Sequence, residues 1–599
     1  MIEEMGIMIQ QLRKKVFASQ ENLSRGLLSA AEFSRIENGE KEADSFLMSA
    51  LFQRLGKSMD QFEMAVSEEE YTLVLLRAFI QESMECGDYD RTEELLDEYE
   101  DSKGSERLLH RQYAQMVRAV LQYLTDRKAE VCLEKLWVAM ELTFEEEGRI
   151  DWTGYRFCIQ EIQILLLIGY FEMELMQYRD AGLLLEKLYH CIDMTYTEGE
   201  SKIQVYSKCC YLLAKAHLHM GKREKAMQVA ESGLENLINR GSLTFMEDLL
   251  ELQQACEWTP EREERLQGIR FAYQLADYSS PKEVVVRLLF AGICSDVLLS
   301  NELLREVRVA QGKTQEELCE GICARETLAK IELGRTPSRC KLQELIRKLG
   351  IDREKYCSYV ITDDWDVFEL VRDYKRNCFE ANQDDALELL AEVEGKLDLS
   401  VPANRQFVEM AHLRHQIRKR EISWDESIKQ LTNILHYTMP EYQGKLYRIP
   451  YREEFIILNR MGLSLKLAGR KEEAMELYED ILQKFQLSKV KPEHHTHTMS
   501  LLYLNYFALL ETYDYLERAS ELGKTGLELM LKYQRGDMVG MFLANLACVY
   551  EKSSTQAEKS LALPCLESSC MLLDLFRLEK KSKAVRKYLD EYYANGTPL

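Results

Sequence analysis

Basic side chains that could contact phosphate groups are concentrated in two windows of this 599-residue chain. Residues 9–58 hold eight Lys and Arg against six Asp and Glu, and residues 301–355 hold twelve against ten. The net charge of the whole chain is −24, so the residues outside these windows carry −28. Affinity for nucleic acid comes largely from clustered Lys and Arg. The charge pattern therefore argues against a general nucleic-acid binder and indicates two local phosphate-binding segments.

A second group with reactive side chains is the only histidine cluster, His494, His495 and His497. Imidazoles at this spacing can bind a transition metal. They follow Lys491-Pro492-Glu493, which is typical of a loop, and no cysteine is close in sequence. We therefore favour a solvated loop and predict no metal site and no cofactor. The chain also lacks a Gly-rich phosphate loop, an HExxH sequence and a nucleophile elbow, so we do not expect an enzyme.

The composition predicts an all-α fold. Glycine (29) and proline (9) are scarce, while Leu, Glu, Lys, Ala and Met dominate. The 16 cysteines show no paired CxxC spacing, which is typical of free thiols in a reducing cytoplasm. No apolar run is long enough to span a bilayer, and the first residues do not have the pattern of a signal peptide. We expect a cytoplasmic protein with no membrane partner.

The chain repeats itself at an offset of 294 or 295 residues. The paired positions are Arg13 with Arg308, Gln20 with Gln315, Leu23 with Leu318, Gly26 with Gly321, Glu37 with Glu332, and Tyr71 with Trp365. Because the match continues through several elements, it indicates internal duplication. It predicts a helix-turn-helix domain at 1–65, an α-solenoid at 66–297, a second helix-turn-helix domain at 298–358 and a second α-solenoid at 359–599.

The second helix-turn-helix unit has the clearer local signals. Thr314 followed by Glu317 predicts a capping box at the start of a helix over about 315–320. Gly321 suits the turn into a recognition helix over about 324–332. Leu318, Ile322, Leu328 and Ile331 have the spacing of a small shared core. At matching positions the first unit has Asn22 in place of the capping Glu, and Ala30, Ala31 and Glu32 at the start of its recognition helix.

Small residues recur within the long helical tracts. Gly169 and Ala181 are twelve residues apart, as are Gly462 and Ala474. Two helices of a hairpin approach closely only where small side chains face each other, and stacked hairpins bury their apolar faces. This spacing resembles tetratricopeptide repeats and predicts two solenoids.

Both units resemble the phage-repressor-like (XRE-type) family of helix-turn-helix domains. The resemblance implies that the glutamine at the start of helix two contacts a phosphate and that the first residues of the recognition helix reach base edges in the major groove. The residues implied for DNA are Gln315, Arg325, Glu326, Thr327, Lys330 and Arg335 in the second unit, and Gln20, Arg13, Arg25 and Arg35 in the first. Arg325 is the candidate for reading a guanine.

A helix-turn-helix followed by such repeats resembles the peptide-pheromone receptors of Gram-positive bacteria, the Rgg, PlcR, NprR and PrgX group. That resemblance implies a short peptide held in the solenoid, partly by asparagine amides, which donate and accept hydrogen bonds like a peptide group. The candidates are Asn459, Asn505 and Asn545. The matching residues of the first copy are apolar, so the second solenoid is the expected receptor.

Two functions remain open at this point. The leading hypothesis is a transcription regulator that binds a double-stranded DNA operator and senses a short peptide in quorum-sensing fashion. It would act either as a dimer of chains or as an intrachain pseudo-dimer. The alternative is a protein–protein interaction scaffold whose helix-turn-helix units do not bind specific DNA. The acidity of the helical tracts and the Ala30-Ala31 pair favour the alternative.

Overall fold

The computed structural model describes residues 3–60, 62–144, 152, 155–196, 200–290, 296–351, 355–380 and 383–593. The chain forms two compact units. Unit 1 comprises Met1–Ser49, Met59–Val74 and Ser295–Leu502, and unit 2 comprises Ala50–Ser58, Leu75–Cys294 and Tyr503–Leu599. Each unit therefore takes segments from both copies of the duplication. The four predicted domains are consecutive stretches of sequence, whereas the two compact units are groups of residues in contact. The four domain boundaries therefore stay a prediction.

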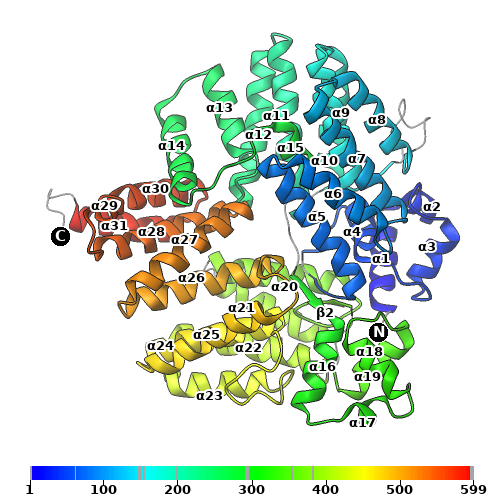
Figure 1. Cartoon of the computed structure of the whole chain (residues 1–599). Helices are drawn as coiled ribbons and strands as arrows, with labels where there is room; N and C mark the ends of the chain where they lie inside the picture. The colour runs from blue at the N-terminus through cyan, green and yellow to red at the C-terminus, as the bar shows by residue number, and fades with distance from the viewer. Residues whose placement is uncertain are drawn as a thin grey trace. The chain divides into compact units, whose positions relative to one another are not determined.

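Unit 1 contains both helix-turn-helix segments, apart from residues 50–54 of the first (Figure 1). The first segment consists of α1 (Glu3–Lys15), α2 (Gln20–Ser24), α3 (Ala30–Glu37) and α4 (Ser45–Arg54). The second consists of α16 (Ser300–Ala310), α17 (Gln315–Cys319), α18 (Arg325–Glu332) and α19 (Arg339–Lys348). Unit 1 continues with α20 (Trp365–Glu380), α21 (Gln383–Lys396), α22 (Pro402–Lys419), α23 (Trp424–Leu435), α24 (Arg452–Leu467), α25 (Lys471–Leu487) and the 3₁₀ turn η2 (Pro492–His494).

Unit 2 consists of further helices from both copies, and α4, α5 and α26 each pass from one unit into the other. From the first copy come α5 (Glu68–Cys86), α6 (Tyr89–Asp101), α7 (Leu108–Asp126), α8 (Ala129–Glu141), α9 (Ile159–Glu174), α10 (Tyr178–Thr195), α11 (Glu200–His219), α12 (Arg223–Arg240), α13 (Met246–Cys256), α14 (Pro260–Leu275) and α15 (Val284–Leu289). From the second come α26 (Thr496–Thr512), α27 (Leu516–Lys532), α28 (Gly536–Glu551), α29 (Gln556–Lys559), α30 (Ala562–Leu575) and α31 (Glu579–Tyr592).

The helices are stacked as consecutive hairpins, as predicted. In unit 2 each helix from α6 to α14 packs against the next, and α14 also packs against α27 and α30. The small residues lie where the helices approach. A Cβ on Gly462 of α24 would lie 2.7 Å from the Tyr478 ring of α25, and one on Gly169 of α9 would lie 2.9 Å from Leu185 of α10. Glycine at these positions therefore permits the close packing of each hairpin.

Three short strands join segments of unit 1 that are far apart in sequence. They are β1 (Glu63–Val66), β2 (Asp296–Leu299) and β3 (Tyr356–Cys357), in the order β2-β1-β3. The central strand β1 is parallel to β2 and antiparallel to β3. The fold is otherwise helical in the described residues. None of the helices described is long and apolar enough to cross a membrane.

Candidate DNA interface and ligand-binding residues

The second helix-turn-helix forms with the predicted boundaries. Thr314 caps α17 through a complete capping box, in which its N–H donates to Glu317 Oε2 at 2.7 Å and its Oγ1 accepts from the Glu317 N–H at 3.2 Å. The Glu317 carboxylate accepts from the Thr314 N–H and, at 3.0 Å, from the Thr314 hydroxyl, and these two hydrogen bonds lower its pKa. Gly321 turns the chain toward α18 with a φ of 78°. Leu318, Leu328 and Ile331 are buried, whereas Ile322 is only partly buried and lies at the margin of the core.

A buried polar cluster holds α16, α17 and α18 together. Arg308 of α16 donates from Nε and Nη2 to the carboxylate of Glu332 at 2.6 and 2.9 Å, and Gln315 Nε2 donates to the same carboxylate at 2.8 Å. The Arg308 and Glu332 side chains are only 12% and 5% exposed. Arg308 also donates to the carbonyl of Lys313 at 2.8 Å. The cluster fixes the angle of the recognition helix within the unit.

The first unit contains the same cluster at the equivalent positions. Arg13 donates to the Glu37 carboxylate at 2.7 and 3.1 Å, and Gln20 donates to it at 2.5 Å. Arg13 also donates to the carbonyl of Ala18 at 3.2 Å. Internal duplication thus extends to individual hydrogen bonds. The geometry gives Arg13, Gln20 and Gln315 a structural part in their units, and their predicted contacts with phosphate stay predictions.

The start of α18 presents the predicted base-reading residues to solvent. Arg325 and Glu326 are exposed and Thr327 is partly exposed, while Lys330 and Arg335 are exposed further along. Arg325 Nε lies 2.8 Å from Glu316 Oε1 of α17, and both side chains are 60% exposed. An ion pair this exposed contributes little free energy, so Arg325 can leave it at small cost.

The start of α3 offers different chemistry. Ala30 and Ala31 are exposed, and Glu32 closes a capping box with Ser29 at the start of the helix. Lys41 Nζ donates to Glu32 Oε1 at 2.6 Å. The hydrogen bond from Lys41 and those from Ser29 lower the pKa of Glu32 to about 2, so the carboxylate stays ionised at neutral pH. Of the basic residues predicted here, Arg25 is partly exposed and Arg35 is exposed, 3.8 Å from Glu40.

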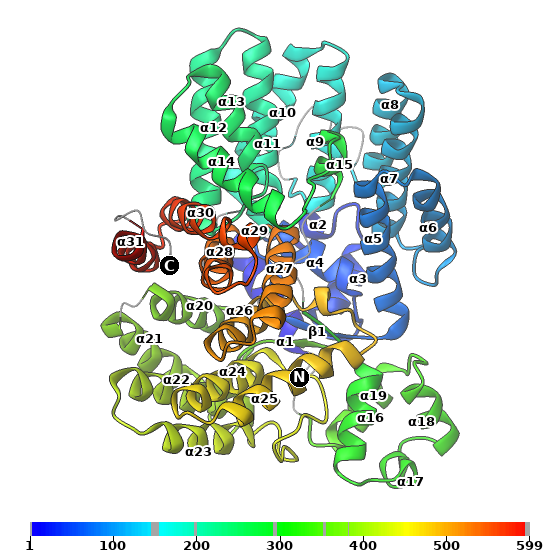
Figure 2. The same ribbon diagram turned by 60° about the vertical axis from the view of Figure 1, so that its left-hand side comes forward.

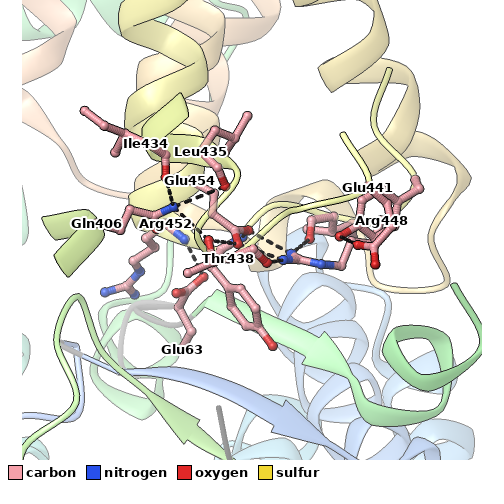
Figure 3. A network of polar contacts seen from close by, with 12 residues as sticks. Glu63, Gln406, Ile434, Leu435, Thr438, Glu441, Arg448, Arg452 and Glu454 are labelled. Carbon is pink, nitrogen blue, oxygen red and sulfur yellow. Dashed lines mark hydrogen bonds and ion pairs between the residues drawn. The ribbon is translucent and has the colours of Figure 1, made fainter. Parts of the chain in front are cut away.

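A network of buried polar groups supports the repeats of unit 1 (Figure 3). Glu454, near the start of α24, accepts from Arg448 at 2.7 Å on both oxygens, from Thr438 at 2.6 Å and from the Tyr451 N–H at 2.8 Å. Gln406 of α22 joins it by donating to Thr438 at 2.8 Å and to the Ile434 carbonyl at 3.0 Å. The network is fully hydrogen-bonded at Glu454, so it fixes where α24 begins.

Arg452 ties α24 to the sheet of unit 1. Its backbone N–H donates to Glu63 of β1 at 2.9 Å, and its guanidinium pairs with Asp296 of β2 and donates to the Asp60 carbonyl at 2.5 Å. Glu63 and Asp296 are direct neighbours in the parallel strand pair, and both are buried. Burial opposes the charge on Arg452, yet the ion pair with Asp296 raises its pKa above the usual value. Arg452 therefore neutralises adjacent carboxylates and joins segments from both copies.

The three asparagines predicted to bind a peptide fall in both units. Asn459 of α24 belongs to unit 1, and its Oδ1 accepts from Tyr478 Oη at 2.9 Å. Asn505 of α26 and Asn545 of α28 belong to unit 2, and both are partly exposed. The aromatic neighbours Tyr506 and Tyr550 are buried in the core of unit 2. A peptide-binding role for the three asparagines stays a prediction.

The histidine cluster is not a solvated loop, and that prediction is wrong. His494 and His495 are each 2% exposed. His494 Nδ1 lies 3.1 Å from Tyr71 Oη, and the ring of His495 packs edge-on against Phe485. Burial lowers the pKa of His495 to about 3. The described residues contain no group of three or more His, Cys, Asp or Glu arranged to hold a metal ion.

A helix-turn-helix family model matches residues 304–356, which span most of α16, all of α17 to α19 and the start of β3. Residues 304–356 form a helix-turn-helix domain of the phage-repressor type. This result agrees with the capping box, turn and core described above. A comparison with curated proteins finds no match.

Several solved structures are similar to about half of the chain. PlcR of Bacillus thuringiensis, in complex with the peptide PapR7 and DNA, is 16% identical over 48% of this chain and 98% of its own, with a TM-score of 0.33. ComR of S. thermophilus, with DNA and its signalling peptide ComS, is 15% identical over 48% and 97%, with a TM-score of 0.29. The pheromone receptor Rgg2 of Streptococcus dysgalactiae is 14% identical over 49% and 99%, with a TM-score of 0.27. These identities and TM-scores are too low to carry an inference about function.

Proposed function

We propose that this chain is a transcription regulator that binds a double-stranded DNA operator through the two helix-turn-helix units of unit 1 and responds to a short signalling peptide. The observation that carries the proposal is the pairing of two equivalent strands. The offset of 294 residues that relates Tyr71 to Trp365 also relates Glu63 of β1 to Cys357 of β3. These strands are antiparallel, and Glu63 lies opposite Cys357.

When two copies of one strand pair antiparallel with a residue opposite its own equivalent, a local two-fold axis passes through that pair. Dimeric helix-turn-helix proteins use such an axis to place two recognition helices on two half-sites about one helical turn apart. Here both helix-turn-helix segments belong to one chain, and the recognition helices α3 and α18 both lie in unit 1. The Arg339 guanidinium donates to the Gly39 carbonyl at 2.6 Å, which is a further direct link between them. The arrangement supports an intrachain pseudo-dimer.

The two recognition helices differ, so we expect an asymmetric operator. The α18 helix presents Arg325, which can donate two hydrogen bonds to a guanine. The α3 helix presents Ala30, Ala31 and the ionised Glu32, with Arg35 nearby. Phosphate contacts position a protein without specifying sequence. We therefore expect α18 to read the bases of one half-site, and the segment around α3 to contact chiefly the phosphate backbone of the other.

Footprinting and native mass spectrometry of the full-length protein on its operator test this proposal. We expect one chain per operator and unequal protection of the two half-sites. Arg325→Ala should weaken specific binding by about 5- to 150-fold, the range for losing a bidentate base contact of roughly 1–3 kcal/mol. Arg179→Ala, at an exposed arginine of α10 in unit 2, is the matched control and should leave binding unchanged.

Two results would count against the proposal. A perfectly palindromic footprint with two chains bound would indicate a conventional dimer of chains in place of the intrachain pair. If the double variant Gln315→Ala/Arg325→Ala changes no DNA-binding pattern, the helix-turn-helix units are structural. That outcome would favour the interaction scaffold, for which the ionised Glu32 and the acidic helical tracts are the supporting observations.

The peptide-sensing part rests on the second copy. Asn505 and Asn545 carry amides that can match a peptide backbone, whereas Leu212 and about Leu252 occupy the matching positions of the first copy and are buried. Replacing Asn505 by Leu should abolish the response to peptide while leaving DNA binding intact, as measured by the shift in operator affinity on adding peptide. An unchanged response would remove Asn505 from the site.

A further inference from the structure

Polar residues replace core residues at a group of positions in the second copy. Arg414, His415 and Arg418 of α22 are equivalent to Val120, Leu121 and Leu124 of α7 at the offset of 294 set by Gln112 and Gln406. Arg460 of α24 is equivalent to Leu167 of α9 at the offset of 293 set by Gly169 and Gly462. All four first-copy residues are buried, with exposed fractions of 0–8%. In the second copy only His415 is buried, while Arg414 and Arg460 are partly exposed and Arg418 is exposed, so the arginines are accessible from solvent.

The equivalent helix hairpins make the same buried contacts in both copies, which makes the comparison direct. Gln112 donates to Thr143 at 2.7 Å and to the Ala139 carbonyl at 3.1 Å, just as Gln406 donates to Thr438 and Ile434. The N–H groups of Cys158 and Tyr451 each donate at 2.8 Å, to Glu161 and Glu454 respectively. The two hairpins are thus held by equivalent hydrogen bonds, while the side chains at the four positions above differ.

Among the described residues, no carboxylate is paired with the arginines of this group. Among the described residues, Arg414 and Arg460 make no hydrogen bond or ion pair, and Arg418 donates only to the Cys378 carbonyl of α20 at 3.4 Å. Burial lowers the pKa of Arg460, and the positive charges of Arg414 and Arg418 lower it further. Like charges held together without a counter-ion are unfavourable. An anion between α22 and α24 would relieve that repulsion.

His415 gives a second, independent indication of a ligand. Its side chain is 6% exposed, yet neither ring nitrogen has a hydrogen-bond partner in the described structure. The ring lies 6.1 Å from that of Tyr374 of α20, and burial, followed by the charge of Arg414, lowers its pKa. A buried polar group without a partner costs about 1–3 kcal/mol, so it usually marks a missing water or ligand. Helices α20, α22 and α24 belong to the group of helices α20 to α25 in the lower part of Figure 2.

We propose that Arg414, Arg418 and Arg460 form a subsite that binds the carboxylate of a short peptide, with His415 as a neighbouring hydrogen-bonding group. This inference rests on the proposed peptide response and names the chemistry of the ligand. Guanidinium groups bind carboxylates through paired, charge-assisted hydrogen bonds. Asn459 precedes Arg460 in α24, and its Oδ1 accepts from Tyr478 Oη at 2.9 Å. The carboxylate comes either from the C-terminus of the peptide or from an Asp or Glu side chain.

Affinity selection with synthetic peptides tests the subsite. The probe is a pool of heptapeptides of mixed sequence, presented to the full-length protein, and the retained peptides are identified by mass spectrometry. The variant Arg414→Val/Arg460→Leu carries the residues of the first copy, which the same frame accommodates. We expect it to retain the selected peptides about tenfold or more weakly, because each charge-assisted hydrogen bond contributes roughly 1.5–3 kcal/mol.

Controls separate charge from folding. Lys429→Leu removes a positive charge from an exposed position on α23 and should not change retention, and the melting temperatures of both variants should stay near that of the parent. Amidating the C-terminus of a retained peptide, and separately replacing its Asp or Glu by Asn or Gln, identifies which carboxylate binds. Loss of retention in either arm supports the subsite.

Three outcomes would overturn the inference. Equal retention by the parent and by Arg414→Val/Arg460→Leu removes these arginines from the site. Retention of peptides without regard to their carboxylates shows peptide binding elsewhere, which leaves the proposed function standing and removes the subsite. Failure to retain any peptide overturns both the subsite and the peptide part of the proposed function.

Discussion

Removal of Glu332 should open the second helix-turn-helix unit selectively. Glu332→Ala leaves the Arg308 guanidinium, now 12% exposed, with only the Lys313 carbonyl as acceptor, and it leaves Gln315 Nε2 without the oxygen it now contacts at 2.8 Å. Breaking a buried ion pair from one side costs about 3–5 kcal/mol, since the remaining charge is left without compensation. That cost is a large part of the stability of a small domain.

Hydrogen exchange provides the assay, because the first unit contains the same cluster and serves as an internal reference. In Glu332→Ala, amides of residues 304–333 should exchange faster by a factor of roughly 100 or more, as a 3 kcal/mol loss implies. Amides of residues 9–38, held by Arg13 and Glu37, should be unaffected. Specific DNA binding should be lost together with this protection.

Two control variants test whether the effect comes from the broken ion pair. Glu326→Ala removes a carboxylate from an exposed position of the same helix and should leave exchange unchanged. Arg308→Met/Glu332→Leu removes both charges, and such replacements are often neutral or stabilising, so protection should return. If Glu332→Ala exchanges like the parent, or if the double variant is as open as the single one, the ion pair does not support the recognition helix.

Two further predictions concern packing and pH in unit 1. Gly462→Ala should destabilise the α24–α25 hairpin by about 1–3 kcal/mol, since the new Cβ would lie 2.7 Å from the buried Tyr478 ring. Gly395→Ala, on α21 with open space around it, should instead stabilise the protein by up to about 1 kcal/mol. Denaturant midpoints of the two variants that move in the same direction would contradict this prediction. Below pH 6.5 the unfolded chain protonates His495, while the folded chain, with a pKa of about 3, does not. As the pH falls below 6.5, this residue should therefore lower the free energy of unfolding by up to about 1.4 kcal/mol per pH unit. The loss of unfolding free energy between pH 7 and pH 5 should be smaller in His495→Leu than in the parent. An unchanged pH dependence would show that His495 is protonated in the folded protein.

Local sequence signals predicted the helix-turn-helix well. The predicted helices at 315–320 and 324–332 are observed at Gln315–Cys319 and Arg325–Glu332, because a capping box and a glycine turn set their ends within a few residues. The small residues at Gly169 and Gly462 likewise identified hairpins whose helices are neighbours in the chain.

Contacts over long sequence separations could not be predicted in the same way. The burial of His494 depends on Tyr71, 423 residues away, and nothing near either residue signals the other. The strands are four, four and two residues long, and β1 pairs with β2, at the junction of the two copies, and with β3 of the second copy. The lack of hydrogen-bond partners at His415 and the absence of ion pairs at the nearby arginines could not be predicted either. The sequence shows residue types but not which side chains lack partners.

The position of β1 between β2 and β3 makes each copy dependent on the other. A first copy alone would expose both edges of β1, and a second copy alone would leave β2 and β3 without the strand that joins them. Unpaired strand edges promote aggregation. During synthesis, residues 63–66 must also wait until residue 357 has left the ribosome before the sheet can close, so folding of unit 1 is late and non-local. Either copy expressed alone should therefore have unpaired strand edges and a tendency to aggregate.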